Sequence, residues 1–289
     1  MAIFLLQGHV MLWSDLLGAL SFQVPSFSFA DFKKLVGSES PQIVEDYFNL
    51  KSDWIFRSEN TLKELKAKNI QWLSPESHLY PKRFKWMKEP PVFLTYIGDM
   101  SCFDRGILSV VGSREPSQAG REFLSQELGI VLQKLPMTIV SGAARGIDQA
   151  AHSCALRNKC STVAILPSGI HAPYPREFKS WVRPILDLGG CILSEYFPGK
   201  IMHRHHFYRR NQIIVGSTKS LLVVEARRKS GSMMTARHAL ENHCDVGVVP
   251  GFPLNPQYGG SLDLLIGTNA VIIRDHLDLL NLMANAEPR

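Results

Sequence analysis

The 289-residue sequence lacks the marks of secreted, membrane-spanning and disulfide-rich proteins. No apolar run is long enough to cross a bilayer, and the first twenty residues show no basic segment followed by a signal-peptide cleavage site. Its cysteines form no Cys-x-x-Cys pair and are odd in number, which fits buried free thiols in a reducing compartment: Cys102, Cys154, Cys160, Cys191 and Cys244. We therefore expect a soluble, cytoplasmic protein with no membrane contact.

Several nucleotide-enzyme motifs are absent as well. There is no Gly-x-x-x-x-Gly-Lys-Ser/Thr loop, which argues against P-loop ATP hydrolysis, and no Gly-x-Gly-x-x-Gly opens a helix, so a nicotinamide cofactor is not favoured. No nucleophile-elbow serine is found. We expect no cofactor.

The composition is that of a globular protein with a sizeable core, at 45% hydrophobic and 20% charged residues. The formal net charge of +6 is compatible with an acidic polymer as partner. Whether the protein binds such a polymer depends more on where the arginines cluster than on the total charge.

The pattern along the chain predicts three regions. Residues 1–73 resemble a small helical module, with Leu16, Leu17 and Leu20 at helical spacing, and residues 74–105 form a proline- and aromatic-rich connecting segment packed on the third region. Residues 106–289 alternate between apolar strands and helices, with strands expected at 107–111, 138–140, 162–166, 191–194, 220–224 and 245–249. This predicts an α/β, extended Rossmann-like domain: a mostly parallel sheet with helices on both faces. Only about forty residues follow Gly251, fewer than a further domain usually has, so we expect no C-terminal winged helix.

A strand, a small-residue loop and a helix follow one another over residues 137–152. The free N–H groups and positive dipole end of such a helix suit an anion, and Gly142 and Gly146 lack the Cβ atoms that would keep a phosphate away. A tight turn packed inside an α/β domain explains the same residues.

Polar and basic residues also follow the other predicted strands. Ligands of open parallel sheets bind at the carboxyl ends of the strands, where arginine forks and backbone N–H groups can hold phosphates. A basic, aromatic stretch, 203–211, suits bases and phosphates of single strands. The DNA- or phosphate-binding candidates are Gly112, Ser113, Arg114, Ser141, Gly142, Arg145, Gly146, Arg176, Arg210, Asn211, Ser230, Gly231 and Ser232. Three near-adjacent histidines, His203, His205 and His206, are poorly spaced for one ion, so we expect no metal.

The motifs, in their order, resemble the DNA processing protein A (DprA, also called Smf) family. They are Gly112-Ser-Arg114, Ser141-Gly-x-Ala-x-Gly-Ile-Asp148, Tyr174-Pro175, Leu193-Ser-Glu-Tyr196, Phe207-x-x-Arg-Asn211, Val224-Glu-Ala226, Ser230-Gly-Ser232, Val249-Pro-Gly251 and Gly259-Gly-Ser261. The resemblance implies a non-catalytic protein that binds single-stranded DNA, protects incoming DNA during natural transformation and passes it to the RecA recombinase. It also implies a homodimer formed through the C-terminal part of the Rossmann domain.

The resemblance also assigns roles to individual residues. Arg114 resembles the arginine that grips phosphate, Arg176 resembles a pocket contact, and Arg210 with Asn211 matches an Arg-Asn pair. The sequence departs from the family where Gln212 replaces a second arginine and Tyr208 replaces a proline.

Two enzymatic alternatives stay open at this stage. A nucleoside-monophosphate phosphoribohydrolase of a related Rossmann group shares the phosphate site, but its Pro-Gly-Gly-x-Gly-Thr loop is replaced here by residues 227–232. A magnesium-dependent nuclease would use Asp148, Glu195 and Glu225, which can equally cap a helix or pair with arginines.

Overall fold

A nine-stranded sheet forms the centre of the protein, in a computed structural model that describes residues 3–6 and 9–284. Across the sheet the strand order is β11-β10-β9-β5-β6-β7-β8-β4-β3. All neighbours pair in parallel except β4 with β8 and β3 with β4, which are antiparallel. The strands are β3 (Gln71–Leu73), β4 (Leu94–Gly98), β5 (Gly106–Gly112), β6 (Met137–Ser141), β7 (Thr162–Leu166), β8 (Cys191–Ser194), β9 (Ser220–Val224), β10 (Asp245–Val248) and β11 (Val271–Ile272).

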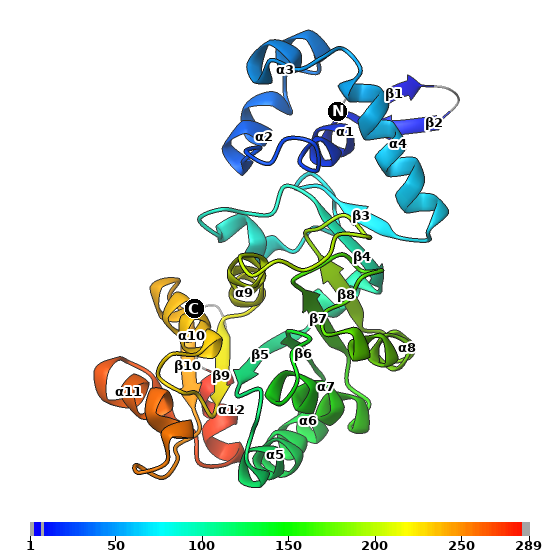
Figure 1. Cartoon of the computed structure of the whole chain (residues 1–289). Coiled ribbons are helices and arrows are strands. Elements are labelled where there is room, and N and C mark those ends of the chain that lie inside the picture. The colour runs from blue at the N-terminus through cyan, green and yellow to red at the C-terminus, as the bar shows by residue number, and fades with distance from the viewer. Residues whose placement is uncertain (1–2, 7–8, 285–289) are drawn as a thin grey trace.

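Helices cover both faces of this sheet (Figure 1). One face carries α5 (Gln118–Phe123), a π-helical turn over Leu124–Leu128, α6 (Gly129–Lys134), α7 (Ile147–Arg157), α8 (Lys179–Asp187) and α12 (His276–Ala284). The other carries α9 (His206–Gly216), α10 (Gly231–Glu241) and α11 (Gly259–Gly267). Every residue of β6, β7 and β9 is buried, because a strand covered on both faces has no solvent side for polar residues. The predicted α/β class is confirmed.

The N-terminal region differs in part from the expectation. Four helices are present, α1 (Trp13–Leu20), α2 (Phe29–Leu35), α3 (Pro41–Phe48) and α4 (Trp54–Ala67), and they lie at one end of the molecule (Figure 1). Before them, however, β1 (Ile3–Leu6) and β2 (His9–Leu12) pair as an antiparallel hairpin. The prediction of helix from residue 1 was wrong here, because a short continuous apolar run has no 3.6-residue period that would distinguish helix from strand.

The N-terminal helices share an apolar core with the sheet. Trp13, Leu17 and Trp54 belong to the same buried cluster as Phe93 of the connecting segment and Ile192 of β8. This packing crosses the boundary expected after residue 73. The division into three regions stays a prediction.

The chain reverses its direction of travel at the middle of the sheet. From β5 it proceeds outward through β6, β7 and β8, and then returns to place β9 against the other side of β5, so that Gly112 lies opposite Val224. At such a switch point the loops after the two central strands lead away from each other and leave a crevice at their carboxyl ends.

Candidate functional site

A cavity of about 850 Å³ lies at this switch point. Its walls are the loop after β5, the loop after β9, and the first turns of α9 and α10. We call it the basic pocket. Two helices of eleven residues each direct their N-terminal turns to it, and the unpartnered N–H groups and dipoles of such turns favour an anion.

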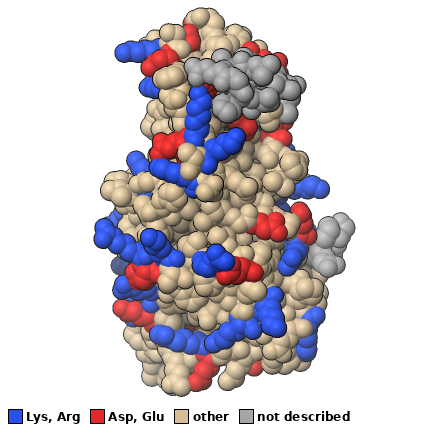
Figure 2. Space-filling model, turned by 90° about the vertical axis from the view of Figure 1, so that its right-hand side faces the viewer, with Lys and Arg blue, Asp and Glu red and all other residues tan. Residues whose placement is uncertain are grey.

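Positive charge dominates the wall of the basic pocket. Two carboxylates line it, Glu115 and Asp148, against seven cationic side chains: Arg114, Arg204, Arg210, Arg227, Arg228, Lys229 and Arg237. Elsewhere the charges are mixed: over the face of the molecule in Figure 2, Lys and Arg are dispersed and several lie beside Asp or Glu.

Ion pairs neutralise only some of these cations. Arg227 pairs with Glu115, and Arg228 with Asp263. Among the described residues no carboxylate lies within ion-pair distance of Arg114, Arg204, Lys229 or Arg237. The pocket therefore keeps an excess of positive charge that a polyanion could neutralise.

Two arginines share one aromatic ring at the floor of the pocket. The guanidinium carbon of Arg114 lies 5.1 Å from the centroid of the Phe207 ring, and that of Arg210 lies 5.6 Å from it. Both distances suit cation–π contacts. The ring, on the first turn of α9, thereby holds two like charges close together, which concentrates positive potential where Arg114 is exposed.

Arg210 is the buried member of this pair, at 5% exposure. Its Nη1 lies 3.7 Å from Oδ2 of Asp148 and 3.4 Å from the carbonyl oxygen of Ile165, while its buried Nε has no hydrogen-bond partner among the described residues. Burial lowers the pKa of Arg210, and Asp148 opposes that change. Burial likewise raises the pKa of Asp148, with Arg210 acting against it. Each group therefore depends on the other to stay charged inside the protein.

Gly142 provides the space in which this ion pair sits. A Cβ atom at position 142 would lie 2.5 Å from the Arg210 Cζ and 2.5 Å from the Asp148 Oδ2. The carbonyl oxygen of Gly142 meets the His152 Nε2 at 2.7 Å, and the other ring nitrogen meets the Thr162 hydroxyl at 2.7 Å. Burial lowers the pKa of His152 to about 4, so this ring is neutral at pH 7.

The glycine loop is tightly packed, and its role in phosphate binding stays a prediction. The space beside Gly142 holds Arg210, and Gly146 (φ +85°) packs against the backbone of Ser113 and Arg114. The N–H of Ile147 donates to the Ser113 carbonyl at 3.0 Å. The loop supports the pocket from behind, as expected of a tight turn packed inside an α/β domain.

The remaining predicted residues fall into two groups. Besides Arg114 and Arg210, six of them line the pocket: Gly112, Ser113, Asn211, Ser230, Gly231 and Ser232. Ser232 donates to the Gly112 carbonyl at 2.6 Å and Ser230 accepts from the N–H of Met233 at 3.3 Å, so these hydroxyls join the two loops and cap α10.

Three other predicted residues lie outside the pocket wall. Arg145 is exposed and pairs with Glu177, Arg176 is exposed in the short 3₁₀ turn Arg176–Phe178, and Ser141 is buried with its hydroxyl on the Val110 carbonyl. The wall also includes Arg204 and Phe207, which lie in the basic, aromatic stretch 203–211, and Arg237, which sequence reasoning overlooked. Arg237 could have been found from its place two helical turns after Ser230 on α10.

The three carboxylates of the nuclease alternative do not come together. Asp148 faces Arg210, whereas Glu195 makes a two-point ion pair with Arg209 at 2.6 and 2.7 Å. Glu225 is fully buried and accepts hydrogen bonds from Ser117 and Tyr258. Across residues 3–6 and 9–284, no group of three or more His, Cys, Asp or Glu side chains is placed to hold a metal ion, and no helix has the length and apolarity of a membrane span.

Residues 71–284 match the family model of DNA recombination-mediator protein A. The chain belongs to this family. Members that resemble it include protein Smf of Synechocystis sp., 35% identical over 228 residues that cover 77% of this chain, and DNA processing protein DprA of Streptococcus pneumoniae, 36% identical over 174 residues that cover 60% of it. These alignments span 56% and 60% of the two relatives' own lengths.

Solved structures of recombination mediators agree with the sequence match. DNA processing protein A of Streptococcus pneumoniae superposes with a TM-score of 0.73 and 29% identity, covering 96% of this chain and 95% of its own. The Helicobacter pylori protein, described for its unique single-stranded DNA binding mode, superposes with a TM-score of 0.66 and 27% identity over 75% of this chain and 98% of its own. The expected family membership is confirmed.

Proposed function

We propose that this protein binds single-stranded DNA in the basic pocket. The observation that carries the proposal is the imbalance of seven cations against two carboxylates at the switch point of the sheet, with four of the cations unpaired among the described residues. Guanidinium groups and helix N-termini both recognise phosphate oxygens, so consecutive phosphates of one strand can lie across the pocket. The Helicobacter pylori relative, described for single-stranded DNA binding, adds support.

The aromatic side chains favour a single strand over a duplex. The Phe207 ring contacts both arginines of the floor, and the next residue, Tyr208, is 55% exposed. Unpaired bases can stack on such rings, whereas paired bases are already stacked within the duplex. Binding of this kind has little sequence preference, because every base has a flat face.

We further propose that the bound strand is protected and passed to the RecA recombinase during natural transformation or recombination. Family membership supports this step. No catalytic step is proposed at the basic pocket.

The C-terminal part of the Rossmann-like region supports a homodimer. β11 is an edge strand of the sheet, and the chain from the loop after β10 through α11 to β11 carries several exposed apolar side chains: Phe252, Leu254, Ile266, Val271 and Ile272. Such a surface is typical of a contact with another protein, and a second copy of the chain would cover both the apolar side chains and the strand edge.

Arg114→Ala tests the proposed function. The guanidinium is exposed and rests on the Phe207 ring, so its loss should leave the fold intact. The variant should bind dT20 and single strands of other sequences more weakly. Removal of one phosphate contact should also reduce the slope of log K against log salt by about 0.7. Fluorescence anisotropy at several salt concentrations measures both quantities.

Arg183→Ala is the matched control. Its side chain is 86% exposed on α8 and pairs only with Asp187, four residues along the same helix. We expect the affinity and salt slope of this variant to equal those of the wild type. Equal binding by the Arg114→Ala and Arg183→Ala proteins would remove the basic pocket from the proposed function.

A further inference from the structure

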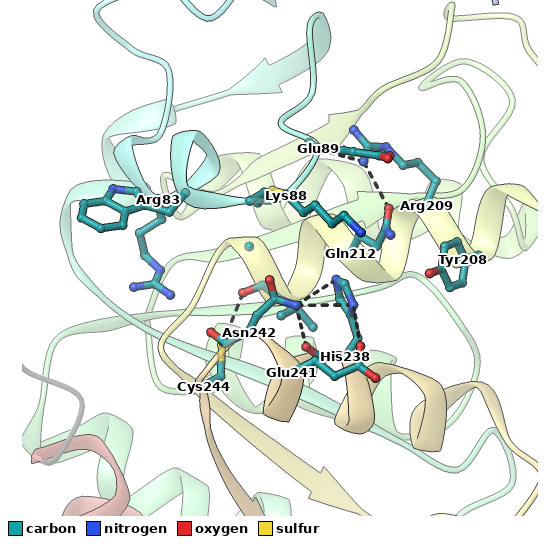
Figure 3. A pocket seen from close by; sticks show the side chains of 14 residues that line it. Arg83, Lys88, Glu89, Tyr208, Arg209, Gln212, His238, Glu241, Asn242 and Cys244 are labelled. Atoms are coloured by element: carbon teal, nitrogen blue, oxygen red, sulfur yellow. Dashed lines mark hydrogen bonds and ion pairs between the residues drawn. The ribbon is translucent and has the colours of Figure 1, made fainter. Parts of the chain in front are cut away.

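A second pocket of about 290 Å³ lies next to the basic pocket. It is enclosed by the 3₁₀ turn Lys82–Trp86 with the residues just after it, and by α9 and α10 (Figure 3). In Figure 3, Lys88 reaches over the pocket towards Gln212 of α9, while His238 and Asn242 approach from α10. We call it the aromatic pocket.

The two pockets share both of their helices. On α9, Phe207, Arg210 and Asn211 line the basic pocket, the neighbouring stripe of Arg209, Gln212 and Gly216 lines the aromatic pocket, and Tyr208 lines both. These stripes follow from the rotation of about 100° per residue along a helix.

On α10 the pockets follow each other along the axis. The helix lines the basic pocket between Gly231 and Arg237, and its last turn with the following residue lines the aromatic pocket between His238 and Asn242. At 1.5 Å per residue, the centres of these two stretches lie about 9 Å apart along the axis, roughly three stacked nucleotides of one strand at 3.4 Å each. A strand held at Arg114 can therefore extend past Tyr208 into the second pocket.

The aromatic pocket offers flat faces and amide groups rather than surplus charge. Trp86 lies at the edge of the pocket and is 88% exposed, and Tyr208 is 55% exposed. Arg209 is paired with Glu195, and the other Lys, Arg and Glu residues of the lining balance each other: Arg83 and Lys88 against Glu89 and Glu241. A phosphate gains little here, whereas a neutral, planar group gains contact area.

Two amides at the wall can recognise the edge of such a group. The Gln212 Oε1 accepts from Arg209 at 3.1 Å, which leaves its NH₂ group to donate. The Asn242 Nδ2 donates to the His238 carbonyl at 2.8 Å, which leaves its oxygen to accept. Donors beside acceptors are the pattern that nucleobase edges present in return.

We propose that the aromatic pocket is a base-binding subsite of the single-strand path, in which an unpaired base stacks on Trp86 after the strand leaves the basic pocket. The inference rests on the proposed function. It divides the work between the two pockets: the first holds phosphates, and the second holds a base.

Tryptophan fluorescence reports on this subsite directly. Of the five tryptophans, Trp13 and Trp54 are buried and Trp72 and Trp181 are partly buried, so exposed-indole emission comes mainly from Trp86. We expect saturating dT20 to quench this emission, and a 20-base-pair duplex to leave it unchanged. Trp86→Phe should lose most of the quenching but keep the affinity within about twofold, because a phenyl face still stacks.

Removal of the ring gives the second measurement. Trp86→Ala should weaken dT20 binding about fivefold, the lower end of what base–aromatic stacking contributes. Its side chain is largely solvated, so the fold does not depend on it. Phe56→Ala, at an equally isolated exposed ring on α4 (54% exposed), is the control and should bind dT20 like the wild type.

The outcomes separate the two proposals. Absence of dT20 binding by the wild type, or binding that does not depend on Arg114, would overturn the proposed function. Arg114-dependent binding in which the Trp86→Phe protein is quenched as strongly as the wild type would overturn the base subsite and leave the proposed function standing. Loss of quenching in Trp86→Phe with weaker binding by Trp86→Ala would support both.

Discussion

Replacement of Gly142 by alanine tests the support of the basic pocket. The new methyl group would overlap the Arg210 guanidinium and lie 2.5 Å from a carboxylate oxygen of Asp148. The backbone at this position is not in the left-handed region, so alanine causes no conformational strain of its own. The whole effect must therefore come from the displacement of the ion pair.

The expected cost depends on what the displaced groups lose. If Arg210 leaves the site, Asp148 remains buried without its cation, and breaking a buried ion pair costs about 3–5 kcal/mol of stability. If instead the backbone shifts to keep the pair, overpacking costs about 1–3 kcal/mol. We expect about 3 kcal/mol for Gly142→Ala, together with weaker binding of single-stranded DNA, because Arg210 also contacts the Phe207 ring.

A double-mutant cycle in urea isolates this mechanism. In an Arg210→Ala background the guanidinium is gone and only the Asp148 carboxylate remains near the new methyl group, so Gly142→Ala should then cost less than in the wild type, and the two changes should be strongly non-additive. Gly37→Ala, where a Cβ meets nothing within 4 Å, is the control and should be nearly neutral. Equal costs for Gly142→Ala in both backgrounds would refute the reasoning.

Two further predictions concern other buried polar groups. The pKa of His152 is about 4 in the folded protein, against 6.5 for an ordinary histidine. Between these pH values only the unfolded chain takes up a proton at this residue, which favours unfolding. The free energy of unfolding should therefore fall by about 3 kcal/mol as the pH is lowered from above 6.5 to 4. Urea midpoints from pH 7.5 to 4.5 should therefore fall less steeply for His152→Gln than for the wild type or for His78→Gln, and equal slopes would contradict the assignment. Tyr258→Phe removes a 2.9 Å hydrogen bond to the fully buried Glu225 carboxylate and should destabilise the protein by about 1.5–3 kcal/mol. Tyr174→Phe, on a ring that is 40% exposed, should change stability by less than about 0.5 kcal/mol in the same urea titration, and an equally small effect of Tyr258→Phe would argue against a buried, hydrogen-bonded carboxylate.

The parallel strands were the most predictable part of the fold. The predicted strands 162–166, 191–194 and 220–224 coincide with β7, β8 and β9, because a strand buried on both faces must be apolar throughout. The antiparallel strands β3 and β4 were not predicted. The first has only three residues, and prolines and aromatics lie around both, so neither the period nor the composition distinguishes them from the connecting segment.

The site was predictable where it lies at the strand ends and unpredictable where it depends on packing. Arg114 and Ser230 lie in the loops that follow the central strands β5 and β9, and the switch-point rule brings such loops to one edge. The opposite case is Gly142, where sequence alone suggests room for a ligand. The space is occupied by Arg210, a residue 68 positions further along the chain, and only the crossing of α9 over the sheet reveals that.

The neighbourhood of β5 and β9 has a consequence for how the protein is made. The two central strands are separated by more than a hundred residues, and β6, β7 and β8 are synthesised between them. While a nascent chain emerges from the ribosome, Arg114 is available early, yet the other wall of the crevice does not exist until β9 and the start of α10 have been translated. The proposed binding of a nucleic-acid strand should therefore become possible only late in synthesis, and a proteolytic fragment that ends before β9 should not bind.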